Sequence, residues 1–186
     1  MQPFIIFVFG LLSLLGSGLG NKVLFINKTP HDRAVCWYPG SIEGSDPKNP
    51  VYYPPIPGTF VKAHGRGATP GIVHGGQYMF RVIYITTGRK GYCNNYQNVE
   101  GEVKFNGEYG RTSFDLSVVK MNEKNLGVQN EQLHWLRPAG GNVPQSGCSS
   151  FPCNNVFKFA GDRDQVKSTT QAELTAVICD GPCDSS

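Results

Sequence analysis

The chain of 186 residues is rich in Gly (23) and Pro (13), only 17% of its residues are charged, and its formal net charge is +3. This composition excludes a coiled coil, a long helical bundle and a charge-rich disordered chain. The small net charge also argues against binding of nucleic acid through a concentrated basic patch. What remains is one turn-rich globular domain, and the aromatic residues favour an all-β fold.

The N-terminus has the features of a secretory signal peptide. Met1–Gly20 contains no charged side chain, Phe4–Leu15 is almost wholly apolar, and small residues follow it. The apolar run is shorter than the roughly 20 residues of a membrane-spanning helix. We therefore expect residues 1–20 to be removed, residues 21–186 to form a single secreted domain, and no association with a membrane.

Short strands and long loops alternate along the rest of the chain. β-Branched and aromatic residues predict strands at Lys22–Asn27, Arg33–Tyr38, Gln77–Thr86, Glu100–Phe105, Thr112–Val119, Val156–Phe159 and Leu174–Cys179. The Asn106-Gly107 turn joins the fourth and fifth of these into a hairpin. The pattern predicts an all-β sandwich with long loops, little helix and disulfides that staple it.

Proline, glycine and asparagine mark the segments between the strands. They predict irregular structure for Pro39–Pro57, Pro70–Gly76 and most of Asn122–Gly147. For Gln165–Glu173 we expect one or two turns of helix.

All six cysteines follow the expected cleavage point: Cys36, Cys93, Cys148, Cys153, Cys179 and Cys183. An even number in an exported chain predicts disulfides. We expect the four C-terminal cysteines to pair among themselves or to reach back once, with Cys36 and Cys93 as the remaining couple. A zinc site formed by those four C-terminal cysteines is the alternative, which the oxidising route of export disfavours.

The segment Asn27-Lys28-Thr29 is a sequon for N-glycosylation. Pro30 follows it directly and weakens the signal, so the sequence leaves open whether Asn27 carries a glycan.

Familiar enzyme motifs are absent from the sequence, which contains no HExxH, no G-x-S-x-G and no phosphate-binding loop. The histidines show no metal-ligand spacing, so neither a metal nor another cofactor is expected. A secreted nuclease would require His64, His74, Glu102 and Arg111 to converge, and their positions in the sequence do not decide this.

A pair of acids on the predicted hairpin is the strongest candidate for a functional site. Glu102 and Asp115 lie on its two arms and alternate with apolar residues, so they are predicted to share one face. Two such carboxyl groups can serve glycoside hydrolysis. The alternative is an ordinary solvated face with a salt bridge to Lys104 or Arg111.

The same hairpin resembles the central hairpin of thaumatin-like proteins. The resemblance rests on the segments Val23–Thr29, Gly101–Gly107, Gly110–Val119, Ser146–Asn155, Asp164–Thr169 and Leu174–Cys179. The C-terminal segments are similar to small secreted fungal members of that superfamily. The resemblance implies a secreted β-sandwich with an acidic cleft, and some members of the family bind or weakly cleave β-1,3-glucan.

The resemblance assigns roles to individual residues. Glu102 matches the glutamate of the family's cleft and Asp115 its first aspartate. Lys120 stands where the family has a second aspartate, and a lysine there would neutralise the cleft and weigh against glucanase activity. Candidates for the remaining charged positions of the cleft are Arg66, Arg111, Asp162 and Asp164.

These observations favour a secreted, monomeric, non-enzymatic binding or effector-type protein at a cell wall, a spore surface or the host apoplast. Its partner would be a cell-wall polysaccharide such as β-glucan or a host extracellular protein. Tyr52 and Tyr53, in the proline-rich loop, are candidates for contact with that partner, whereas Trp37 is expected in the core. A weak endo-β-1,3-glucanase that uses Glu102 and Asp115 is the alternative function.

Overall fold

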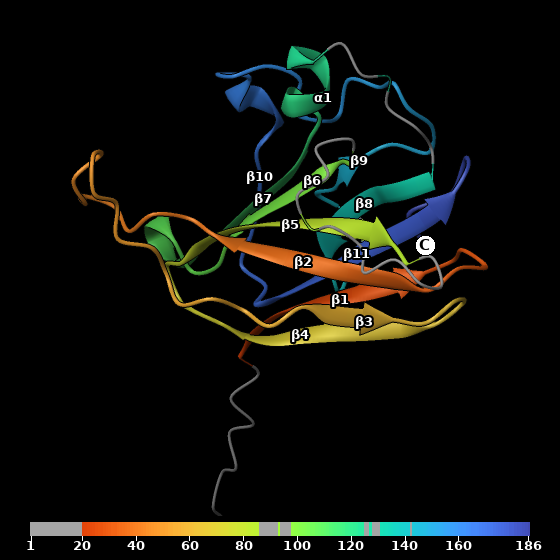
Figure 1. The fold of residues 1–186 in the computed structure, drawn as a ribbon, viewed down its shortest axis with the longest axis horizontal. Helices are drawn as coiled ribbons and strands as arrows, with labels where there is room; N and C mark the ends of the chain where they lie inside the picture. Colours follow the sequence, from red (N-terminus) through yellow and green to blue (C-terminus); the bar gives the residue numbers. More distant parts are fainter. Residues whose placement is uncertain (1–19, 86–92, 94–97, 125–126, 128–130, 142) are drawn as a thin grey trace, which may run out of the picture.

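Two β-sheets packed face to face form the body of the protein (Figure 1). The computed structural model describes residues 20–85, 93, 98–124, 127, 131–141 and 143–186, so the predicted signal peptide lies outside them except for Gly20. The five-stranded sheet has the order β4 (Arg66–Ile72), β1 (Asn21–Asn27), β11 (Glu173–Asp180), β8 (Glu131–Pro138) and β9 (Ser146–Gly147). The six-stranded sheet has the order β10 (Lys167–Thr169), β7 (Thr112–Ser117), β6 (Glu100–Lys104), β5 (Gln77–Tyr84), β2 (Arg33–Pro39) and β3 (Thr59–Val61).

Helical structure is scarce in the described part of the chain. It comprises α1 (Val119–Glu123) and the 3-10 turns η1 (Glu108–Gly110) and η2 (Arg163–Gln165). No described helix is long and apolar enough to cross a membrane. The prediction of an all-β sandwich with little helix is therefore confirmed.

The core lies between the two sheets because each sheet turns one set of alternating side chains inward. In β1, Val23 and Phe25 are fully buried, while the residues between them are half-buried. The ring of Phe25 packs edge to face against the ring of Phe80 of β5, with centroids 5.3 Å apart. The ring of Trp37 of β2 also packs against Phe80, with centroids 4.9 Å apart. The expectation that Trp37 belongs to the core is confirmed.

Several predictions of strands need correction. Val156–Phe159 forms no strand, and only Phe157 makes an isolated bridge, to Ser117. Most of Asn122–Gly147 was expected to be irregular, but it contains β8, a strand paired on both sides. The segment expected to be helical, Gln165–Glu173, contributes one residue to η2 and then forms β10. Strands β3, β4 and β9 were not predicted either.

The six cysteines form three disulfides: Cys36–Cys93, Cys148–Cys153 and Cys179–Cys183. This is the expected pairing of Cys36 with Cys93, and the other four pair among themselves. The zinc alternative is wrong, since every sulfur that it needs is used in a disulfide.

Candidate functional site

The hairpin of β6 and β7 places its polar side chains on the outer face of the six-stranded sheet. Glu102 lies directly opposite Asp115 across the two strands, and Met79 of β5 lies on the other side of Glu102. The neighbours Val103 and Phe114 point the other way and are buried in the core. Directly opposed residues of antiparallel strands have Cβ atoms about 4.5–5.5 Å apart. The prediction that Glu102 and Asp115 share one face is therefore confirmed.

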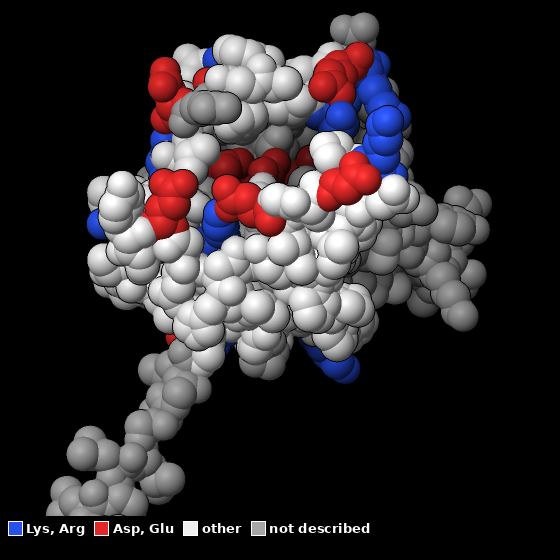
Figure 2. Space-filling view, turned by 90° about the vertical axis from the view of Figure 1, so that its left-hand side faces the viewer, with Lys and Arg blue, Asp and Glu red and all other residues white. Residues whose placement is uncertain are grey.

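Both carboxyl groups line a cavity of about 590 Å³. An adjoining hollow of about 350 Å³ shares Lys104, Glu108 and Ser113 with it. We call the two together the outer groove, and its described lining residues are Gln77, Glu102, Val103, Lys104, Glu108, Tyr109, Arg111, Ser113, Phe114, Asp115, Phe157, Val166 and Ser168. Figure 2 shows a hollow with acidic side chains on its floor and along its edge.

The neighbouring charged pair on the same face is internally compensated. Arg81 of β5 donates from Nε to Glu100 Oε1 over 2.8 Å and forms a salt bridge with the same oxygen, and both side chains are buried. The guanidinium of Arg81 also lies over the ring of Tyr38, 4.8 Å from its centroid. By contrast, neither Glu102 nor Asp115 forms a salt bridge with another residue of the described ranges.

The carboxyl of Asp115 is protonated at neutral pH. Burial, and secondly the charge of Glu102, raise the pKa of its carboxyl to about 8, while Lys167 on the edge strand β10 opposes the shift. Burial, and secondly Glu100, also raise the pKa of Glu102. Asp115 is only 6% exposed, and its Oδ1 has no hydrogen-bond partner in the part of the chain that the structure describes. The pair can therefore supply a protonated carboxyl beside a second acidic group.

Lys120 and Arg111, which the sequence associated with the acid pair, lie away from the pair or at the edge of the groove. Lys120 is on α1, pairs with Glu123 at 2.9 Å, and is absent from the described lining of the groove. Arg111 lines the adjoining hollow, where its Nε donates to Ser168 Oγ over 3.0 Å. The lysine that acts on Asp115 is instead Lys167, which the sequence did not indicate because β10 lies far along the chain.

The alternative of a surface salt bridge does not describe the acid pair. Lys104 lies 3.6 Å from Glu43, which comes from the loop after β2, and Arg111 bonds to Ser168. The histidines required for a nuclease site, His64 and His74, are not among the described lining residues of the groove.

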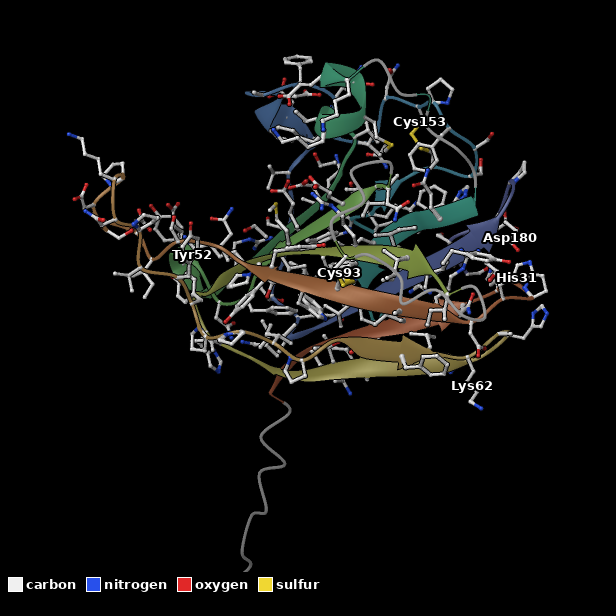
Figure 3. The ribbon with its side chains drawn as sticks, viewed as in Figure 1. His31, Tyr52, Lys62, Cys93, Cys153 and Asp180 are labelled. Carbon is white, nitrogen blue, oxygen red and sulfur yellow. A yellow bond between two sulfur atoms is a disulfide. The ribbon has the colours of Figure 1, made fainter. Side chains whose placement is uncertain are left out.

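The aromatic candidates of the proline-rich loop differ in exposure. Tyr52 is 57% exposed and lies at the end of the molecule opposite to His31 and Asp180 (Figure 3). Tyr53 is half-buried, donates to the carbonyl of Gly75 over 3.1 Å and packs against the core. Only Tyr52 is therefore presented to a partner, and neither residue lines the outer groove.

Asn27 is buried in a way that leaves no room for a glycan. Its side chain is 1% exposed, and Nδ2 donates to the carbonyls of His31 (2.8 Å) and Lys62 (2.9 Å). Its Oδ1 accepts from the backbone N–H (3.0 Å) and the hydroxyl (2.8 Å) of Thr29. Both amide hydrogens are used in the fold, so this geometry disfavours a glycan on Asn27, a question that the sequence leaves open.

Comparison with known proteins identifies similar molecules, among them one curated protein and one solved structure. No protein-family model matches the chain. A segment of 78 residues, 42% of this chain, is 33% identical to half of the antigenic protein SchS21 of Stachybotrys chartarum, so the chain spans about half the length of this curated relative. The fold is similar to that of the protein elicitor MoHrip2 of Magnaporthe oryzae, with a TM-score of 0.52 and 13% identity over 86% of this chain and 99% of that one.

These comparisons contradict the resemblance to thaumatin-like proteins. Neither similar protein is described as a member of that family, and no family model supports it. The roles that the resemblance assigned to Glu102, Asp115, Lys120 and Arg111 therefore lose their basis in a family. What remains for these residues is the geometry of the outer groove.

Proposed function

We propose that the protein is a secreted, non-enzymatic effector-type protein that acts outside the cell by binding a partner in the outer groove. The observation that carries the proposal is the buried Asp115, which lines the groove and whose Oδ1 has no hydrogen-bond partner among the described residues. Burying such a group costs about 1–3 kcal/mol, so its position is better explained by binding than by stability. Three disulfides suit a domain that works in an oxidising compartment.

The similar proteins support this kind of function. One is described as an antigenic protein and the other as a protein elicitor, and both descriptions fit molecules that a foreign organism meets outside the producing cell. A host extracellular protein is the partner we favour over β-glucan, because carboxyl groups line the groove.

Infiltration of leaf tissue tests the proposal. Purified protein with intact disulfides should cause ion leakage or an oxidative burst, and the Glu102→Gln/Asp115→Asn variant should require about tenfold more protein for the same response. Glu173→Gln is the matched control, because Glu173 is a half-buried carboxylate of the other sheet that pairs with Lys22 at 2.8 Å. An unchanged dose response in the double variant would show that the groove is not needed for the response.

A pull-down on insoluble β-glucan distinguishes the two kinds of partner. It should retain little of this protein if the partner is a protein.

Hydrolysis of β-1,3-glucan is a second candidate function, which the protonated state of Asp115 favours. In that case Asp115 would donate its proton to the leaving oxygen, and Glu102 would act on the anomeric carbon or on water. Incubation with soluble β-1,3-glucan, followed by measurement of reducing ends, tests it against Glu102→Gln. Equal, background-level release by both proteins would eliminate this function.

A further inference from the structure

We propose that the outer groove binds a cationic side chain, the ammonium of a lysine or the guanidinium of an arginine on a partner protein, between Glu102 and Asp115. This inference rests on the proposal that the groove is a binding site, and it adds the chemistry of the partner.

The first observation is the oxygen that lacks a donor. Asp115 Oδ1 is buried at the floor of the cavity without a hydrogen-bond partner from the described residues. Once it ionises, the carboxylate only accepts hydrogen bonds, so the group that completes it in that state must donate. Lysine and arginine donate several hydrogen bonds and carry a positive charge, and charge-assisted bonds of this kind are the strong ones.

The second observation is the balance of charge around that oxygen. Glu102, Asp115 and Glu108 line the cavity, and the one cation in its described lining, Lys104, is drawn to Glu43 at 3.6 Å.

The remaining charged groups near the acid pair leave this excess in place. Glu100 is compensated by Arg81, and the charge of Lys167 on β10 only partly offsets the effects that raise the pKa of Asp115. On the neighbouring elements, Lys120 pairs with Glu123 and Arg111 bonds to Ser168. An added cation would stabilise the ionised form of both carboxyl groups, which a neutral sugar hydroxyl would not do.

The third observation is the apolar wall of the cavity. Phe157 is half-buried and Val166 is 44% exposed, and both line the cavity with the two carboxyl groups. Such a wall suits the methylene stem of lysine or arginine, whose charged end can reach the acids while its stem covers apolar surface. A bare metal ion would not use this wall, and the described residues contain no cluster of metal ligands.

Binding of a cation should be coupled to release of a proton. In the free protein the pKa of Asp115 is about 8, so its carboxyl is protonated at neutral pH, and a bound cation favours the ionised form. Affinity should therefore rise by up to about tenfold per pH unit as the pH approaches 8, and then level off. A ligand held by neutral hydrogen bonds would lack this linkage.

Calorimetric titration of the mature chain tests the inference. The probes are the tripeptide amides acetyl-Arg-Arg-Arg and acetyl-Lys-Lys-Lys, with acetyl-Glu-Glu-Glu as the control, at about pH 6 and about pH 8 in two buffers of different ionisation enthalpy. We expect a basic tripeptide to bind at least about tenfold more tightly at the higher pH, with about one proton released near neutrality. The acidic tripeptide should not bind.

Variants and a second cation locate the site. Glu102→Gln should weaken binding about tenfold, Asp115→Asn should abolish the pH dependence, and Glu173→Gln should change neither. Since Asp115→Asn alters a buried group, its amide NMR spectrum must first match that of the native fold, and Glu102→Gln serves as the test if it does not. Tighter binding of spermidine than of either peptide would overturn the assignment to a protein side chain.

The outcome also separates this inference from the proposed function. If neither basic peptide binds while the leaf response still depends on Glu102 and Asp115, the groove is a binding site, but its ligand is not a lysine or arginine side chain. If the peptides bind and the response does not depend on these residues, the cation-binding site is supported and the role of the groove in the leaf response is rejected.

Discussion

Glu102 lies directly opposite Asp115 across β6 and β7, and both line the outer groove, where Asp115 is buried and Glu102 is half-buried. Burial and the nearby charge of Glu102 raise the pKa of Asp115 to about 8. The unfolded chain loses this proton near pH 4, whereas the folded chain keeps it up to about pH 8. The free energy of unfolding should therefore fall with pH between these values, by about 1.4 kcal/mol per pH unit from this group alone. Urea unfolding at intervals of about one pH unit measures the slope.

Asp115→Asn removes the titrating group without changing its shape, so it should abolish most of that slope. The variant should be more stable than the native protein near pH 8 by a few kcal/mol, and about equally stable near pH 4. Glu173→Gln, on the other sheet, should keep the native slope. A slope that survives in Asp115→Asn would mean that other groups account for the pH dependence.

The parts of the fold that local chemistry decides were predictable from the sequence. The hairpin of β6 and β7 follows from apolar alternation on both sides of Asn106-Gly107, but the connection is a longer loop that contains η1, and only Asn106 of the pair has a positive φ (48°). The alternation also places Glu102 and Asp115 on one face, which is the core of the candidate site. That the cysteines form disulfides, with Cys36 and Cys93 as one couple, was expected from the predicted export, whereas the pairing of the other four was left open.

Strand β8 could not be predicted, because its polar side chains receive their partners from distant segments. Gln132 Oε1 accepts from the backbone N–H of Val99 over 2.8 Å, and Arg137 Nε donates to the carbonyl of Ser185 over 2.6 Å. Both residues are buried, although their polarity suggests a loop. The strand exists because tertiary contacts satisfy these groups, and this outweighs local propensity.

The residues that surround the acid pair could not be predicted from the sequence either, because they come from distant segments. Phe157, Val166 and Lys167 come from segments well beyond the hairpin, and no local pattern links them to it. Without them the acids look like an ordinary solvated face. Burial, which raises both pKa values, is a property of the assembled sandwich.

Gly101 should tolerate no side chain, because the ring of Phe80 fills the space that a Cβ would occupy. The two residues are direct neighbours across β5 and β6, and Phe80 is held by Phe25 and Trp37 in the core. We expect Gly101→Ala to lower the free energy of unfolding by about 1–3 kcal/mol, measured by urea unfolding. Gly141→Ala is the control, since its Cβ would meet nothing within 4 Å and should change stability by less than about 0.5 kcal/mol.

The disulfides should contribute unequally to stability. Cys36–Cys93 joins residues 57 positions apart, whereas Cys179–Cys183 spans 4. The longer loop restricts the unfolded chain more, so Cys36→Ala/Cys93→Ala should cost about 4 kcal/mol and Cys179→Ala/Cys183→Ala about 2 kcal/mol. Denaturant unfolding of the two double variants measures the difference. Equal losses would indicate that local packing, rather than loop closure, sets the contribution of each bond.

The secreted, folded protein should carry no glycan on Asn27, even when a glycosylating host produces it. A glycan would replace a hydrogen of Nδ2, which the fold uses to bond the carbonyls of His31 and Lys62. Mass spectrometry should show no shift after treatment with an N-glycosidase. Asn27→Ala, which leaves those buried groups without partners, should lower the free energy of unfolding by at least about 2 kcal/mol. A properly folded, secreted product whose mass falls on deglycosylation at Asn27 would contradict the buried position of this side chain.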